Sequence, residues 1–206
     1  MELISIFKNW GVPKWIKVDN GRPFGDPKME TVPALALWLI ALNIQMIWNK
    51  PRTPQENAKV ERCQGTLGKW TEYKRCKSTF DLQARLWEES EFYNFDFPIA
   101  RRQNQKRITL FPKLGHTGRF WNPADFKIQR VLNFLSNGCW ERVVSSVGQT
   151  NLYGHVLQIG TQYKNQRISI KLCPILNHWR FYDAKGSLIK TLPTAINKNS
   201  IWSLDL

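Results

Sequence analysis

The segment PALALWLIALNI, residues 33–44, is the most apolar stretch of the chain and limits what the chain can fold into. A helix made from it has no polar face, so we predict a helix at about residues 30–42 that is buried on all sides. The 12 residues of this segment are too few to cross a bilayer. The sequence therefore predicts a helix inside a globular protein with no membrane association.

Strands and helices alternate around this segment. Short apolar runs predict strands at 15–18 and 44–48, and helical spacing predicts helices at about 2–9, 55–75 and 80–94. Thr53 is expected to cap the long helix, because Pro54 and Glu56 follow it in a capping-box pattern. Alternating helices and strands indicate an α/β layer in this half of the chain.

The formal charge of +14 is spread unevenly along the chain. Residues 1–97 carry a net +2, residues 98–125 a net +5 and residues 126–206 a net +7. A basic surface of this kind suits a polyanion, which favours nucleic acid as the partner. The plainer alternative is a basic protein with no such partner.

Four cysteines, Cys63, Cys76, Cys139 and Cys173, are far apart in the sequence and form no C-x-x-C pair. This spacing is typical of reduced thiols, which we expect to be mostly buried. It favours a cytoplasmic protein.

The pattern changes after Pro98. The next residues are polar, basic and rich in Pro and Gly, and they predict a linker over 98–138. Strand candidates follow at 140–147, 152–159, 167–172, 178–183 and 187–192, with a hairpin turn at 184–186. In the third, Ile168, Ile170 and Leu172 alternate with polar residues. Five short strands predict a small closed β-barrel.

Two acidic residues are candidate metal-binding carboxylates. Asp19 directly follows the strand at 15–18, and Glu61 lies on the helix at 55–75. Each has a plainer interpretation, a turn residue for Asp19 and a solvated helix residue for Glu61. Asp26, the other acid near Asp19, is interpreted as a turn residue ahead of Pro27. Gln64, Gly65, Gly68 and Lys69 fall on or beside the Glu61 face of the helix, where two glycines would let a nucleic-acid backbone approach.

The segments VDNGRPF (18–24) and PRTPQENAKVER (51–62) resemble the catalytic core of retroviral-type integrases and bacterial insertion-sequence transposases. The segment from Tyr153 to Pro193 resembles the small Src-homology-3-like barrel that follows this core. The resemblance implies a ribonuclease-H-like α/β core at 1–97, a basic linker at 98–138 and an all-β barrel at 139–206. It also implies a D…D…E acid triad, in which Asp19 matches the second Asp and Glu61 the Glu.

The first Asp of that triad has no counterpart among residues 1–18, so we expect it, with the first strands of the core, on a segment outside this chain. The resemblance implies metal-dependent DNA strand transfer by the intact protein, with Mg²⁺ or Mn²⁺ held only by the complete site. The chain alone is then expected to be inactive. Its expected partners are DNA, the missing half supplied in trans, and further copies of the intact protein.

Residues expected to contact DNA come from the loop after the second strand, the long helix, the linker and the barrel. They are Lys50, Arg52, Gln64, Lys69, Arg101, Arg102, Lys106, Arg107, Arg167 and Lys171. Trp48, Trp121 or Trp179 could stack on bases.

Two other functions remain open. One is a non-catalytic DNA-binding protein, either a regulator or a remnant. The other is a stand-alone metal-dependent nuclease that uses Asp19, Glu61 and a substitute acid. Metal-dependent nicking by this chain would distinguish the nuclease from the others.

Overall fold

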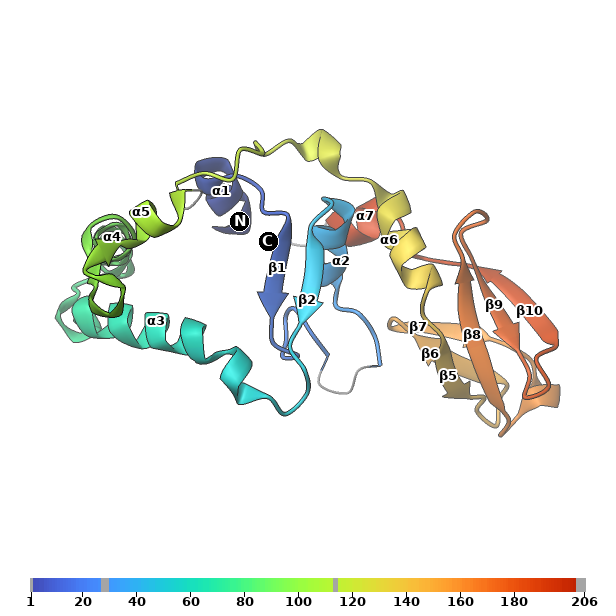
Figure 1. The fold of residues 1–206 in the computed structure, drawn as a ribbon. Coiled ribbons are helices and arrows are strands. Elements are labelled where there is room, and N and C mark those ends of the chain that lie inside the picture. Colours follow the sequence, from blue (N-terminus) through green and yellow to red (C-terminus); the bar gives the residue numbers. More distant parts are fainter. Residues whose placement is uncertain (1, 27–29, 113–114, 203–206) are drawn as a thin grey trace. The chain divides into compact units, whose positions relative to one another are not determined.

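The structure is a computed structural model that describes residues 2–26, 30–112 and 115–202. The chain divides into two compact units, each assembled from segments far apart in the sequence (Figure 1). The first unit comprises Met1–Pro13 and Asn49–Trp121, and the second comprises Lys14–Trp48 and Asn122–Leu206. Each unit contains residues from before and after the predicted domain boundary at residue 97. The predicted division into domains at residues 97 and 138 stays a prediction.

The second unit holds a parallel strand pair. Strands β1 (Trp15–Val18) and β2 (Gln45–Trp48) pair in register from Trp15 with Gln45 to Val18 with Trp48. Helix α2 (Ala34–Ala41) connects them. A parallel pair needs such a crossover connection, because a tight turn cannot join two strands that run the same way. Both strands lie where the sequence predicted them.

Helix α2 is buried from Leu35 to Ala41, as its composition predicted. It begins at Ala34, four residues later than expected, directly after Pro33. Helices α6 (Ile128–Ser136) and α7 (Lys198–Trp202) pack against it. Full burial of each large apolar side chain contributes about 1.5–3 kcal/mol.

Part of the predicted linker is a packed helix. Three apolar side chains of α6, those of Val131, Leu132 and Leu135, are buried. Their helical spacing was hidden by the Pro- and Gly-rich residues before them. The Lys127 amide and the Arg130 guanidinium both donate to the Ala41 carbonyl oxygen, at 3.0 and 2.8 Å. These bonds fix α6 to the end of α2.

Short antiparallel strands follow α6. They are β5 (Trp140–Val143), β6 (Gln149–Leu152), β7 (His155–Gln158), β8 (Arg167–Cys173), β9 (His178–Tyr182) and β10 (Leu188–Pro193). Among the described residues, the hydrogen-bond ladders form a four-stranded sheet in the order β10-β9-β8-β5 and a separate β6-β7 hairpin. The Src-homology-3-like barrel and the ribonuclease-H-like core stay predictions.

One strand prediction in this region is wrong. Residues 152–159 form the end of β6, a turn and β7, because Tyr153 and Gly154 adopt φ values of 53° and 76° and reverse the chain. Two other predictions are confirmed. Ile168, Ile170 and Leu172 are buried on one face of β8, and the turn at 184–186 joins β9 to β10.

The first unit is mainly helical. It contains α1 (Glu2–Trp10), α3 (Ala58–Trp70), α4 (Thr79–Glu91) and α5 (Arg107–Leu110), with a π-helical turn at Phe92–Asp96. Two short strands, β3 (Pro98–Ile99) and β4 (Gln105–Lys106), pair in antiparallel fashion. Aromatic side chains hold part of it together, with the Trp70 and Phe97 ring centroids 4.8 Å apart.

The predicted long helix at 55–75 is interrupted. A 3-10 turn at Pro54–Glu56 precedes α3, and a second at Tyr73–Arg75 follows it. The predicted capping box is wrong, because α3 begins at Ala58 with Asn57 at its N-cap position. The Thr53 hydroxyl instead donates to the Pro51 carbonyl oxygen at 3.3 Å. In α4, by contrast, the Ser78 hydroxyl accepts the Asp81 amide at 3.1 Å and forms a regular N-terminal cap.

The two units differ sharply in their cores. Among the described residues, the first unit buries only Phe7 and Val12 as apolar side chains, while the second buries the α2 segment and one face of β8. Neither α3 nor α4 has a buried residue.

We therefore expect the first unit to open more easily than the second. Amides in α3 and α4 should exchange with deuterium at least about 100-fold faster than those in α2 and β8, because few buried contacts oppose local opening. Hydrogen exchange measured by mass spectrometry checks this within one sample. Equal protection of the two units would contradict it.

Candidate functional site

Asp19 stands at the carboxyl end of β1 and is exposed. Its Oδ1 accepts the Gly21 amide at 2.9 Å, so the carboxylate organises the turn that follows the strand. The interpretation of Asp19 as a turn residue is thus confirmed. It leaves a carboxylate at the strand end, which is where sheets of parallel strands place their ligand sites.

Glu61 lies in the first turn of α3 and is exposed. Gln64, Gly65 and Gly68 follow at helical spacing on its face, and Lys69 lies beside them. A Cβ atom added at either glycine would meet no atom within 4 Å. This face of α3 is therefore open at its two glycines.

The two acids belong to different units, Asp19 to the second and Glu61 to the first. Within the described part of the chain, no group of three or more His, Cys, Asp or Glu residues could hold a metal ion. No reaction step through a metal follows from the described residues. Magnesium or manganese stays a prediction for the complete site.

Asp26 caps its own loop. Its Oδ2 accepts the backbone amides of Glu30 and Thr31, both at 3.2 Å, and lies 3.4 Å from the Thr31 hydroxyl. These bonds agree with the predicted turn role.

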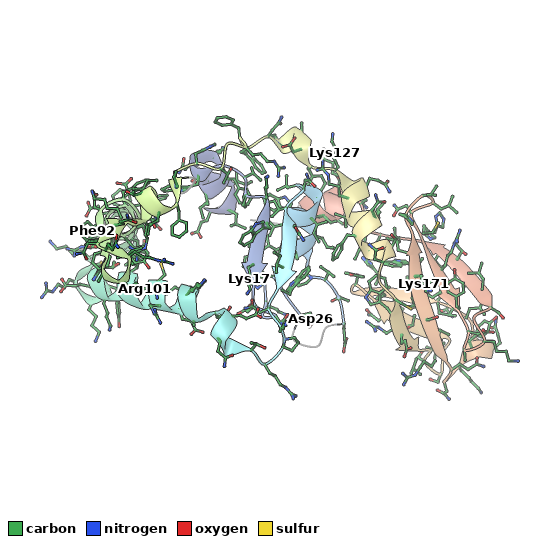
Figure 2. All side chains as sticks on the ribbon, viewed as in Figure 1. Lys17, Asp26, Phe92, Arg101, Lys127 and Lys171 are labelled. Carbon is green, nitrogen blue, oxygen red and sulfur yellow. The ribbon has the colours of Figure 1, made fainter. Side chains whose placement is uncertain are left out.

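The predicted DNA-contacting residues have different surroundings. Lys50 and Arg52 are exposed on the loop after β2. Arg101, which is labelled in Figure 2, is exposed with Arg102 in a 3-10 turn. Gln64, Lys69 and Lys171 are exposed as well. Two others make exposed ion pairs at 2.9 Å, namely Lys106 with Asp96 and Arg167 with Glu141.

Arg107 differs from the other predicted contacts, because it is half-buried and its guanidinium contacts the protein. Its guanidinium lies 3.5 Å from the centre of the Tyr93 ring, and its Nη1 donates to the carbonyl oxygens of Tyr93 and Phe97, at 2.8 and 3.4 Å. These contacts fix α5 to the π-helical turn. Sequence reasoning missed this structural role, although the aromatic run FYNFDF beside a basic segment was a usable signal.

Tyr153 was also missed. Its hydroxyl oxygen accepts the Val32 amide at 3.3 Å, and its ring stacks on Trp179. With Arg22 and Arg142 it lines a cavity of about 920 Å³. Burial raises the pKa of Tyr153 to about 12, against smaller lowering effects of the Val32 amide and the Arg142 charge. In the sequence, only the Tyr153-Gly154 pair stands out at this position, and it indicates the turn rather than the buried hydroxyl.

Two further predictions are wrong. The cysteines are free, but Cys63, Cys76 and Cys173 are half-buried and Cys139 is exposed, so they are not mostly buried. Trp179 is 3% exposed and cannot stack on a base, because it fills the interior of the sheet.

No family model matches the chain. Searched over the described residues, the structure has no helix long and apolar enough to cross a membrane.

The raised pKa of Tyr153 gives a testable pH dependence. The neutral phenol is favoured in the folded state, so its contribution to stability is present below pH 10 and is lost as the pH rises to about 12. Replacing Tyr153 by Phe should remove this contribution, so that the free energy of unfolding falls less steeply over that range.

Denaturant unfolding at a series of pH values checks this. Absorbance of tyrosinate provides a second readout, since the substitution should remove one of the five tyrosines and the titration near pH 12. Parallel pH profiles of the two proteins would contradict the assignment.

Proposed function

We propose that this chain binds DNA as part of a transposase or integrase of the DDE class, whose intact form carries out metal-dependent DNA strand transfer. In this proposal Asp19 and Glu61 are two of the three metal-binding acids, and the first Asp comes from a segment outside the chain. The protein acts in the cytoplasm on DNA and forms oligomers when intact. Its α/β part is a ribonuclease-H-like core without its first strands, and its β part is a Src-homology-3-like barrel.

One observation supports this proposal most. Asp19 directly follows a strand that pairs in parallel with the next strand through a buried crossover helix. Ligand sites in such sheets gather at the carboxyl ends of the strands. Glu61 then follows on the first long helix after β2, exposed on a face that two glycines leave open.

The distribution of charge supports DNA as the partner. The first unit holds 16 Lys and Arg against 9 Asp and Glu, and the second holds 14 against 7, so each carries a net +7. Several of these cations are exposed and come from both units, among them Arg52, Arg101 and Lys171. Phosphate contacts from cations of this kind supply affinity that does not depend on sequence.

A non-catalytic DNA-binding protein is the second candidate. It predicts the same salt-dependent DNA binding but no restored cleavage when the missing half of a transposase is added.

We expect the full chain to bind duplex DNA in a salt-dependent manner. If it neutralises about four phosphates, the slope of log K against log salt should be near −3.6. Replacing Arg101 and Arg102 by Gln should reduce the slope by about 1.8, because each lost phosphate contact removes about 0.9.

Fluorescence anisotropy over a salt series checks this. Lys74→Gln with Lys77→Gln is the matched control, because it removes the same charge from an exposed connection that is not expected to contact DNA. Binding that does not vary with salt, or no binding at about 50 mM salt, would overturn the proposal.

We expect the chain alone not to nick or join labelled DNA in Mg²⁺ or Mn²⁺, because two acids do not complete a two-metal site. Adding the N-terminal half of a related transposase in trans should restore activity. Either Asp19→Asn or Glu61→Gln should abolish the restored activity, while Asp26→Asn should retain it. Cleavage by the lone chain that survives both of the first two substitutions would falsify the assignment of these acids.

A further inference from the structure

The turn between β8 and β9 presents two adjacent apolar side chains to solvent. Ile175 is 90% exposed and Leu176 is 55% exposed. Residues 174–177 form the turn, so both side chains stand at the tip of the hairpin. Leaving large apolar side chains in water is unfavourable, and two neighbours at one tip favour a binding partner.

This tip is held in one conformation. Pro174 restricts its own φ, and Asn177 adopts a positive φ of 52°. The Asn177 carbonyl oxygen accepts the Thr194 amide at 3.0 Å, which attaches the turn to the end of β10. The His178 ring nitrogen contacts the Leu176 carbonyl oxygen within the same turn. The apolar pair is thus displayed by a rigid support.

Two cations lie behind the tip on the outward face of the same hairpin. Lys171, which is labelled in Figure 2, lies directly opposite Arg180 across β8 and β9. Their neighbours in the strands, Ile170 and Phe181, are buried on the other face. Like charges in such a pair repel each other. Neither makes an ion pair with any residue that the structure describes. An anionic ligand would relieve this repulsion.

We infer that the β8–β9 hairpin binds duplex DNA with Lys171 and Arg180 on backbone phosphates and with Ile175 and Leu176 inserted between base pairs. This inference rests on the proposed DNA-binding function and adds a mode of contact to it. Ile175 is four positions after Lys171, and even a fully extended chain of that length spans only about 13 Å, which is well under the length of one helical turn of DNA. Proteins that bind the minor groove use such apolar wedges to unstack and kink the duplex.

An anionic membrane is the other partner that a basic and apolar surface suits. Membrane-surface elements present a broad apolar face that lies in the plane of the interface. Here the apolar part is two residues at the end of a rigid hairpin, with the cations behind it. That arrangement favours insertion at one point, as in a kinked duplex.

The test compares full-length variants on labelled duplex DNA. Ile175→Asn with Leu176→Asn should weaken binding about tenfold or more, because two buried apolar contacts are lost. The salt slope should stay unchanged, because no charge is removed. Energy transfer between dyes at the two DNA ends should show loss of the bend. Val147→Asn is the matched control, an exposed apolar residue in the turn after β5, at the opposite end of β8 from the tip.

The double variant Lys171→Gln with Arg180→Gln should change the salt dependence of binding and leave the DNA bend unchanged. It should reduce the salt slope by about 1.8 while the bound DNA stays bent. If the tip variant binds and bends DNA as the unchanged chain does, the wedge is overturned and DNA binding stands. If the unchanged chain binds no DNA, the proposed function and this inference both fail. If the tip variant loses binding only to vesicles of anionic lipid, the membrane is the partner and the inference is wrong.

Discussion

Helix α2 has no polar face, and the second unit is organised around the need to cover it. The strands β1 and β2 flank it in the chain, but α6 and α7, which pack against it, come from residues after 127. The Ala41 carbonyl oxygen at its end accepts two hydrogen bonds from the segment that begins α6. Helix α2 is buried by helices from a distant part of the chain. The unit that contains Asp19 therefore also contains the four-stranded β-sheet that follows α6.

The first unit has no uniformly apolar helix of this kind among its described residues, and it buries fewer apolar side chains. Its helices α3 and α4 have amphipathic rather than uniformly apolar sequences, and neither buries a residue completely. Its contacts are instead between aromatic rings and around the Arg107 guanidinium. An exposed helix with two glycines on one face is poorly suited to stabilising a core.

The local sequence patterns with the clearest apolar period predicted the local structure, whereas the turn at Tyr153–Gly154 and the start of α3 were missed. The four residues of β1, the burial of α2 and the alternation in β8 each depend on a period of apolar residues that a short window contains. Patterns that depend on distant partners were missed. Examples are the apolar face of α6, which is recognisable only beside α2, and Arg107, whose contacts come from the turn at Phe92–Asp96. Asp19 and Glu61 were chosen for their positions in the sequence, and the structure gives each an exposed place on an element of the expected type.

The order of segments in the second unit has a consequence for synthesis on the ribosome. Helix α2 is synthesised before α6 and α7, which follow about 90 and 160 residues later. At a synthesis rate of about 5–20 residues per second, roughly 5 to 30 s pass before the helices that bury α2 have been synthesised. During this interval the most apolar segment of the nascent chain is exposed. Chaperones that recognise short apolar stretches are therefore expected to bind that segment.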